Sequence, residues 1–196
     1  MKTKGEKTKQ FIIEQSAVLF NKKGMAGTSV SDVMAATKLA KGGIYGNFDS
    51  KEDLCRAVFD YLMERLTANI TSRLADKATH KEKLFALLDH YNDIGPISVA
   101  GGCPMLNFGT EADDTDPLMK EKVANAIKLS QARIARIVSA GIAAGEFADT
   151  VHPQTFAVKM FAMFEGAVLI SKMFDNNSQM KIITKLLKEE IESFSL

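Results

Sequence analysis

The chain carries apolar residues at helical spacing from end to end. Segments such as the one with Leu84, Leu87 and Leu88 repeat apolar positions every three or four residues. No run convincingly alternates apolar and polar residues, as a half-buried strand would. The pattern therefore predicts an all-α fold of about nine helices.

Capping signals mark the starts of several of these helices. Three pairs have the Ser/Thr-x-x-Asp/Glu spacing of a capping box: Ser29 with Asp32, Ser50 with Asp53, and Thr79 with Glu82. Three later helices are expected to begin at a capping residue: Asp116, His152 and Ser178. These signals favour an N-terminal domain of three helices over residues 1–50 and a larger helical domain over residues 51–196.

Residues 28–54, TSVSDVMAATKLAKGGIYGNFDSKEDL, form the most informative segment. A short helix is expected to open at Val30, a turn to follow at residues 37–39, and a second short helix to run from about Ala40 to Asn47. A third helix then opens after Ser50. This order is typical of a helix–turn–helix, which presents its second helix to the major groove of DNA. The segment therefore predicts a DNA-binding regulator.

The second short helix has two unlike faces. At about 100° per residue, Ala40, Ile44 and Phe48 share one face and are expected to dock on the first short helix. The opposite face and its flanks consist of Lys41, Gly42, Gly43, Tyr45, Gly46 and Asn47. Each glycine lowers helix stability by roughly 1 kcal/mol relative to alanine. The face is either a flexible surface turn or, as we favour, a place where a phosphate or base edge approaches the backbone closely.

Charge is unevenly distributed, although the whole chain carries only +1. Residues 1–51 contain nine lysines and four acidic residues, a net charge of +5, and the remainder has 16 basic and 20 acidic residues, a net charge of −4. A basic end on an acidic body suits contact with nucleic acid. The first lysines form either a solvated tail or a disordered arm that reaches phosphates: Lys2, Lys4, Lys7 and Lys9.

The segment from Phe11 to about Val58 resembles the DNA-binding domain of the TetR family of repressors. The strings AVLFNKKG, TSVSDVMAAT and AKGGIYGNFDSKEDL carry the resemblance, and the last fits the family pattern K-G-x-x-Y-x-x-F-x-S-K-E-x-L. Two positions depart from the family. Lys38 stands where the family has glycine, which predicts a left-handed backbone at a non-glycine residue. Ala40 replaces the Ser or Thr cap of the recognition helix.

The resemblance implies a homodimeric transcriptional repressor that a small molecule releases from a palindromic operator in double-stranded DNA. The residues expected to contact DNA are Thr28, Ser29, Lys41, Gly42, Gly43, Tyr45, Asn47 and Lys51. Phosphates are assigned to Thr28, Ser29, Tyr45 and Lys51, and a guanine edge is assigned to Lys41. Because few side chains face the bases, DNA shape is expected to carry much of the specificity.

The last two long helices are apolar on two sides. Over residues 156–174, Phe156, Met160 and Phe164 form one stripe, while Phe161 and Val168 belong to another. Such a helix must bury one side in its own core and the other elsewhere. A dimer interface of four helices is therefore expected at Phe161, Val168, Leu169, Ile183, Leu187 and Ile191. The alternative is a monomer that buries all of them internally.

Phe, Met and Leu residues are frequent in the middle helices. Such residues usually form core, but they also line pockets for varied apolar ligands. Because the family binds small inducers, the resemblance implies a pocket for an apolar or amphipathic effector, lined by Phe85, Leu88, Met105, Phe108, Met160, Met163 and Phe164. The segment GGCPMLNFGTE also resembles a G-C-x-x-x-N-x-x-x-E string of one family branch. Its Asn107 and Glu111 either face the ligand or tie this segment to its neighbours.

The two cysteines, Cys55 and Cys103, are expected to be reduced thiols of a cytoplasmic protein. Cys103 begins a helix, where a thiolate is favoured, so a regulator that senses electrophiles or oxidants is an alternative to a small buried side chain. A further alternative is an enzyme with Cys103 as nucleophile and His90 as base. The three histidines lack metal-ligand or triad spacing. We therefore expect no enzyme activity, no metal and no cofactor.

No segment predicts a targeting signal or a membrane span. The apolar string FIIEQSAVLF is interrupted by Glu14, and residues 156–174 carry Lys159, Glu165 and Lys172. The expected partners are therefore operator DNA, a small-molecule effector and a second copy of the chain. A purely architectural helical dimer, by contrast, would bind DNA without responding to any metabolite.

Overall fold

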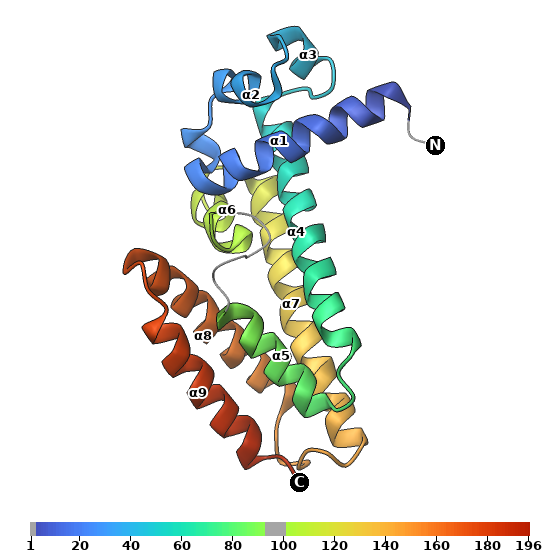
Figure 1. Cartoon of the computed structure of the whole chain (residues 1–196), viewed down its shortest axis with the longest axis vertical. Helices are drawn as coiled ribbons and strands as arrows, with labels where there is room; N and C mark the ends of the chain where they lie inside the picture. Colours follow the sequence, from blue (N-terminus) through green and yellow to red (C-terminus); the bar gives the residue numbers. More distant parts are fainter. Residues whose placement is uncertain (1–2, 93–100) are drawn as a thin grey trace. The chain divides into compact units, whose positions relative to one another are not determined.

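The computed structural model describes residues 3–92 and 101–196, with the side chains of all of these except 91 and 92. These residues form nine α-helices and no β-strand, which confirms the all-α fold. The helices are α1 (Lys4–Gly27), α2 (Val30–Thr37), α3 (Lys41–Tyr45), α4 (Lys51–Ala75), α5 (His80–Asn92), α6 (Pro104–Ala112), α7 (Pro117–Ala143), α8 (Pro153–Met173) and α9 (Ser178–Ser193) (Figure 1).

The described chain forms two compact units. The head unit comprises residues 3–66 and 101–123, and the body unit comprises residues 67–92 and 124–196. Helices α4 and α7 each contribute to both units. Helix α6 packs against α1 and therefore clusters with the N-terminal helices, and the domain boundary expected at residue 50 stays a prediction.

The N-terminal lysines belong to a helix. The hydroxyl of Thr3 accepts the N–H of Glu6 at 3.2 Å, and the Glu6 carboxylate accepts the N–H of Thr3 at 2.6 Å, so a capping box opens α1. The alternative of a disordered lysine arm is therefore wrong, except that Lys2 lies outside the described residues. Near its end α1 is interrupted at Gly24, where φ is 78° and ψ is 177°.

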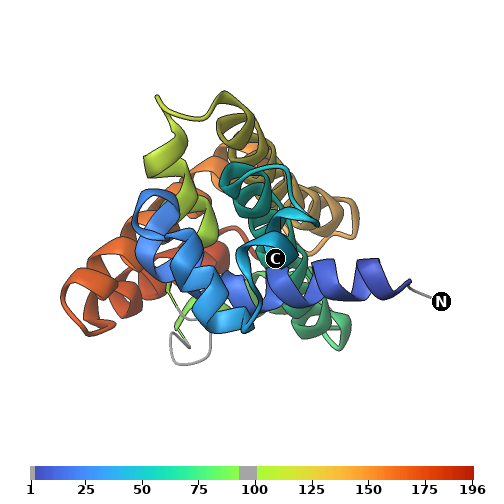
Figure 2. The same ribbon diagram turned by 90° about the horizontal axis from the view of Figure 1, so that it is seen from above.

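Six helices supply the core of the head unit. Its buried apolar side chains include Ile12 and Phe20 of α1, Val33 of α2, Ile44 of α3, Leu54 and Phe59 of α4, Phe108 of α6, and Met119 of α7. The rings of Phe59 and Phe108 lie 5.5 Å apart and are tilted by 57°, which joins α4 to α6. Figure 2 shows α1 and α2 side by side. The short helices are thus held on a scaffold made by the longer ones.

Helices α5, α8 and α9 form the core of the body unit with the ends of α4 and α7. Phe147, which follows α7, and Phe156 of α8 both meet the ring of Phe194 edge-on, at centroid distances of 5.2 and 5.3 Å. Gly141 lies so close that a Cβ would be 2.2 Å from the Phe147 ring. An isolated bridge pairs Phe147 with Ser195. The glycine thus lets the chain after α7 fold back onto the helix and meet the C-terminal residues.

Most of the predicted capping residues are found at helix starts. The box of Thr79 and Glu82 is confirmed, with N–H···O distances of 3.0 and 3.1 Å. The Asp116 carboxylate accepts a backbone N–H in the first turn of α7 at 3.0 Å. The prediction for Ser178 is wrong, because it is the first residue of α9 and its hydroxyl donates to the Asn176 side chain at 2.6 Å.

Across residues 3–92 and 101–196, none of the helices combines the length and apolar character that a membrane crossing requires. The same residues contain no cluster of three or more histidines, cysteines or acidic residues that could hold a metal ion.

Candidate nucleic-acid interface

The first helix of the helix–turn–helix, α2, begins at the predicted capping box. Ser29 Oγ accepts the Asp32 N–H at 3.1 Å, and the Asp32 carboxylate accepts the Ser29 N–H at 2.9 Å. The Lys23 ammonium lies 2.7 Å from the same carboxylate. The hydrogen bonds from Lys23 and then from Ser29 hold the pKa of Asp32 far below its usual range. Because the Asp32 carboxylate is bonded in its ionised form, it stabilises the folded chain. This stabilisation is fully present above about pH 4 and declines as the pH falls below that value.

The turn after α2 holds Lys38 in the predicted left-handed conformation. Its φ is 60° and its ψ is 20°. Its N–H donates to Met34 O at 2.9 Å, and the Thr37 hydroxyl donates to Val33 O at 2.8 Å. These bonds satisfy carbonyl groups at the end of α2 and offset a left-handed conformation that costs a non-glycine residue roughly 1–2 kcal/mol.

The inner face of α3 is anchored by two buried side chains. Ile44 and Phe48 are each 2 % exposed. The Lys9 ammonium of α1 lies 4.9 Å from the centre of the Phe48 ring, a contact that the sequence analysis missed. The prediction that Ala40 docks beside Ile44 is wrong: Ala40 precedes the helix in an extended conformation, is exposed, and makes no side-chain capping bond.

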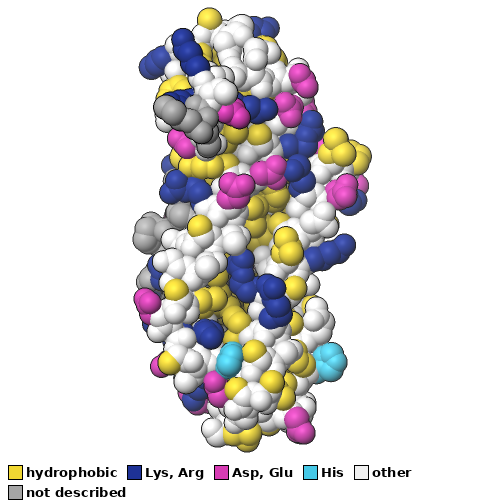
Figure 3. Space-filling view, turned by 90° about the vertical axis from the view of Figure 1, so that its right-hand side faces the viewer, with side chains coloured by type: hydrophobic (Ala, Val, Ile, Leu, Met, Phe, Trp, Pro, Cys, Tyr) yellow, Lys and Arg dark blue, Asp and Glu magenta, His cyan; other side chains and the backbone are white. Residues whose placement is uncertain are grey.

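The outer face of α3 is open to solvent. We define the reading surface as the exposed residues Lys41, Gly42, Gly43 and Tyr45. The Tyr45 side chain is 39 % exposed, and the Lys41 ammonium lies 5.8 Å from the centre of its ring. In Figure 3, lysine and arginine side chains stand among acidic and apolar ones at the upper end, which carries α2 and α3. The arrangement presents a cation, a phenol and bare backbone on one ridge.

The fold does not require glycine on the reading surface. A Cβ at Gly42 would meet no atom within 4 Å, and a Cβ at Gly43 would lie 3.5 Å from Leu39 Cβ, an ordinary contact. Alanine would therefore fit at both positions and would favour the helix by about 1 kcal/mol at each. Glycine here leaves the backbone accessible to a close approach from outside.

Thr28 does not belong to this surface. Its side chain is fully buried, and its hydroxyl donates to Gly24 O at 2.7 Å. The prediction that it contacts a phosphate is therefore contradicted. The sequence did contain a local signal for the observed hydrogen bond to Gly24 O, because Ser and Thr hydroxyls often donate to the carbonyl four residues earlier.

Three more of the predicted DNA contacts make hydrogen bonds within the head unit. The Lys51 ammonium donates to Met25 O at 2.9 Å, the Asn47 amide to Gly43 O at 2.8 Å, and the Ser29 hydroxyl to the Asp32 carboxylate at 2.8 Å. Each of these groups stabilises a turn or a helix end that supports α2 and α3. Their first role is therefore to position the reading surface.

The seven residues predicted to line one pocket lie in separate places. Met105 and Phe108 are in the core of the head unit, and Leu88 is fully buried in the body unit. Met160 and Phe164 do share a cavity of about 20 Å³ within the body unit. Its lining is Ile70, Leu87, Ser130, Arg133, Ile134, Met160, Phe161 and Phe164. The remaining residues, Met163 and Phe85, are half-buried outside this lining.

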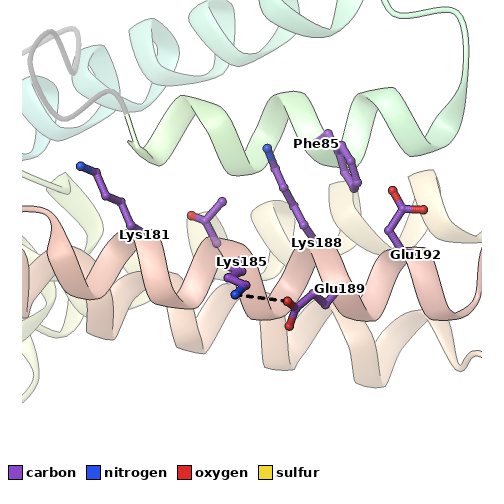
Figure 4. Close-up of a pocket in the computed structure, with 7 residues that line it drawn as sticks. Phe85, Lys181, Lys185, Lys188, Glu189 and Glu192 are labelled. Carbon is purple, nitrogen blue, oxygen red and sulfur yellow. Dashed lines mark ion pairs between the residues drawn. The ribbon is translucent and has the colours of Figure 1, made fainter.

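Phe85 instead lines a surface groove of about 420 Å³ beside α9 (Figure 4). The other residues of the groove come from α9: Lys181, Thr184, Lys185, Lys188, Glu189 and Glu192. The Lys188 ammonium lies 5.1 Å from the centre of the Phe85 ring and 2.7 Å from the Asp89 carboxylate. Lys185 and Glu189 form a further ion pair. These paired charges are typical of a solvated helix face.

The residues predicted at a dimer interface are divided between core and surface. Four are buried within the body unit: Phe161, Val168, Leu187 and Ile191. The prediction that these four face a partner is contradicted, because the fold of a single chain already covers them. Leu169 is 44 % exposed, and Ile183 is half-buried.

An exposed apolar surface adjoins these residues. We define the apolar face as Val158, Leu169 and Met173 of α8, Phe174 at its end, and Ile182 and Leu186 of α9. Their exposed fractions lie between 44 and 63 %. Helices α8 and α9 pack against each other, and each carries some of these exposed apolar residues. Of the α8 residues that the sequence assigned to a partner, Leu169 is exposed, whereas Phe161 and Val168 are buried; the stripe assigned to the core, Phe156, Met160 and Phe164, is buried as expected.

Both cysteines are buried. Burial is the main cause that raises the pKa of the Cys55 thiol to about 12. Cys103 is 6 % exposed and provides no side-chain hydrogen bond as the N-cap of α6. The thiol-sensing alternative, which needs an accessible thiolate at Cys103, is therefore not supported.

These features place the chain in the class of helix–turn–helix transcriptional regulators. Residues 12–58 match the family model of bacterial regulatory proteins of the tetR family, and residues 80–187 match the model of the tetracyclin repressor-like C-terminal domain. The chain belongs to the TetR family of transcriptional regulators.

This chain is similar to helix–turn–helix regulators over most of their length. An HTH-type transcriptional regulator in the lacX 3′ region of Lactococcus lactis subsp. lactis is 27 % identical over 189 residues, covering 94 % of this chain and 93 % of that protein. The HTH-type transcriptional repressor DhaR of Mycobacterium sp. strain GP1 is 23 % identical over 168 residues, covering 86 % and 84 %. A TetR-family regulator from Cytophaga hutchinsonii has a solved structure with a TM-score of 0.96 and 36 % identity, covering 100 % of this chain and 98 % of that one.

Replacing Lys38 with glycine is expected to leave stability unchanged or raise it by up to about 1 kcal/mol. Glycine adopts the left-handed conformation without steric cost, but it also loses more freedom on folding. Urea unfolding measures the change. The control Lys22→Gly, at an exposed helical position of α1, should lose about 1 kcal/mol. Equal losses at the two positions would contradict the role assigned to the turn.

Proposed function

We propose that this chain is a homodimeric repressor that binds a palindromic DNA operator and is released by a small-molecule effector. The main support for DNA binding is the reading surface, an exposed surface of α3 with glycines that the fold does not require. The opposite side of α3 is anchored by the buried Ile44 and Phe48. Family membership supports the same conclusion. The repressor role is supported by the relative DhaR, which is a transcriptional repressor.

Each part of the reading surface suits a different DNA contact. Lys41 would donate to a guanine edge, since lysine bonds well to O6 and N7. The Tyr45 hydroxyl would donate to a phosphate oxygen. The backbone at Gly42 and Gly43 would lie close to the duplex, so the width and bending of the groove would contribute to specificity. The net charge of +5 over residues 1–51 adds attraction that is independent of sequence.

Substitutions on the reading surface test these roles. Lys41→Ala should weaken binding to the DNA upstream of the gene by roughly tenfold and relax base preference, because one base contact is worth about 1–3 kcal/mol. Tyr45→Phe should weaken binding to all sequences alike, because phosphate contacts carry no sequence information. Fluorescence anisotropy measures both, and wild-type affinity should fall steeply as salt rises.

The matched control is Lys128→Ala, which removes an exposed lysine of α7 in the body unit and should leave affinity within about twofold. Wild-type binding that ignored salt would contradict phosphate-led recognition. An equal loss in the control would show that general charge, rather than the ridge, is responsible.

The apolar face supports a second copy of the chain as its partner. Its six side chains are 44–63 % exposed, and monomers rarely expose large apolar surfaces without a function. Because α8 and α9 pack together, a twofold copy laid on this face would complete a four-helix interface. A twofold pair also matches a palindromic operator, whose half-sites lie about 34 Å apart.

Leu169→Glu should raise the dissociation constant of the dimer by about thirtyfold or more, because it places a charge in the centre of the apolar face. Sedimentation velocity across a concentration series measures the change. Leu118→Glu is the control, since Leu118 is 58 % exposed but belongs to α7 in the head unit. A wild-type protein that stays monomeric at micromolar concentration would reject the dimer.

The small cavity supports an effector site inside the body unit. Most of its lining is apolar, and Ser130 and Arg133 add two polar groups, which suits an amphipathic molecule with one polar end. The cavity of about 20 Å³ has room for about one water molecule, whereas ligand sites measure roughly 300–1,000 Å³. An effector would therefore enter only a state in which the surrounding helices have separated, and its binding would favour that state.

A thermal-shift screen with apolar and amphipathic compounds should identify molecules that raise the melting temperature and weaken DNA binding. Ser130→Leu, which fills the cavity, should abolish the shift. Ser139→Leu, at an exposed position of the same helix, should retain it. Compounds that stabilise both variants equally would bind elsewhere and would reject this site.

A further inference from the structure

The interruption of α1 at Gly24 creates two backbone donors directly before the helix–turn–helix. After Gly24 the chain makes one more helical turn over residues 25–27, and Thr28 then leads into α2. The N–H groups of Met25 and Ala26 begin this turn. They therefore lack the carbonyl partners that a continuous helix would supply.

Glu111 of α6 supplies those partners from far along the chain. Its Oε1 accepts the Met25 N–H at 3.0 Å, and its Oε2 accepts the Ala26 N–H at 2.9 Å. Both carboxylate oxygens thus act as a cap for the last turn of α1. Hydrogen bonds to an ionised acceptor are stronger than those between neutral groups.

Asn107, one helical turn before Glu111, makes a second connection to α1. Its side-chain amide donates to Asn21 O at 2.9 Å, to Asn21 Oδ1 at 3.0 Å and to Gly101 O at 3.0 Å. The Asn21 amide in turn donates to Gly102 O at 3.1 Å. These bonds answer the question that the sequence left open for this motif, because both of its polar side chains contact α1.

The same turn is held from the opposite side. The Lys51 ammonium, at the start of α4, donates to Met25 O at 2.9 Å. Met25 is therefore bonded through its N–H to α6 and through its carbonyl to α4. A displacement of either helix by more than about 0.5 Å would lengthen these bonds beyond useful hydrogen-bond distance.

Gly24 is required for this arrangement. Its φ of 78° disfavours any residue with a side chain, and a Cβ there would lie 1.9 Å from Glu111 Oε1. The close approach of the carboxylate and the left-handed backbone therefore occur at the same residue.

We propose that Asn107 and Glu111 form a clamp that holds the last turn of α1 and thereby positions the helix–turn–helix for DNA binding. This inference rests on the proposed DNA binding. The clamp residues touch no DNA. They act by fixing the turn from which α2 and then α3 continue, so the orientation of the reading surface depends on the position of α6.

The test compares Glu111→Ala and Asn107→Ala with wild type on a duplex that the wild-type protein has selected from a random pool. Each variant should lose about tenfold or more in affinity, because a hydrogen bond to a charged group contributes roughly 1.5–3 kcal/mol. The slope of affinity against salt should stay unchanged, because the phosphate contacts remain the same in number. Amide exchange at Met25 and Ala26 should accelerate in Glu111→Ala.

The matched control is Glu121→Ala, which removes an exposed acid of α7 in the head unit and should retain wild-type affinity and exchange. Should Glu111→Ala unfold, Glu111→Gln carries the test, because it keeps the size of the side chain and one carbonyl acceptor. Glu111→Gln should show an intermediate loss of DNA affinity at temperatures where its circular dichroism matches wild type.

A double-mutant cycle with Gly24→Ala separates the clamp from general stability. Gly24→Ala should lower DNA affinity less in the Glu111→Ala background than in wild type, because the carboxylate it would displace has already been removed. The clamp would be overturned if the losses of DNA affinity from Gly24→Ala and Glu111→Ala were additive. It would also be overturned if a Glu111 variant kept wild-type affinity while its Met25 and Ala26 amides exchanged freely. A wild-type protein that selects no duplex would overturn the proposed function instead.

Discussion

A helix of five residues has too few hydrogen bonds to persist by itself, so the reading surface depends on the burial of Ile44 and Phe48 beneath it. Burying a side chain of this size contributes roughly 1.5–3 kcal/mol, which offsets the cost of the glycines on the opposite face. The Lys9 contact with Phe48 extends the support to α1. The geometry of the outer face is therefore determined by residues that a ligand on that face would never touch.

Local signals in the sequence predicted most of the fold. The all-α class, the capping boxes of Ser29 with Asp32 and of Thr79 with Glu82, and the left-handed Lys38 were predicted correctly, because each depends on residues a few positions apart. In the third pair the Ser50 hydroxyl accepts the Asp53 N–H, but the Asp53 carboxylate accepts the N–H of Asp49. Predictions failed where a side chain had two possible environments. Thr28 was assigned to a phosphate but is buried and donates to Gly24 O, and Leu187 was assigned to a dimer interface but is buried, because it lies on a helix that is apolar on more than one side. Periodicity identifies apolar sides but does not say which one the chain covers itself.

The candidate effector residues were grouped by composition, and composition carries no positional information. Met160 and Phe164 do line the cavity, whereas Phe108 packs against Phe59 in the head unit. The polar residues of the lining, Ser130 and Arg133, were not predicted. Both residues lie on a long amphipathic helix. In the sequence pattern of such a helix, a half-buried polar side chain cannot be distinguished from an exposed one until the neighbouring helices are known.

The glycines of α3 have a further consequence for how this regulator discriminates among sites. With no side-chain cap at Ala40 and with Gly42 and Gly43 within its five residues, α3 has little helical stability of its own, and in the proposed complex part of the binding free energy would be used to order it on the duplex. A backbone that settles against the groove adapts to small differences in its width. Such a protein would suit a set of imperfect operators better than a single site that is recognised base by base. The occupancy of each operator would depend on how readily its duplex deforms.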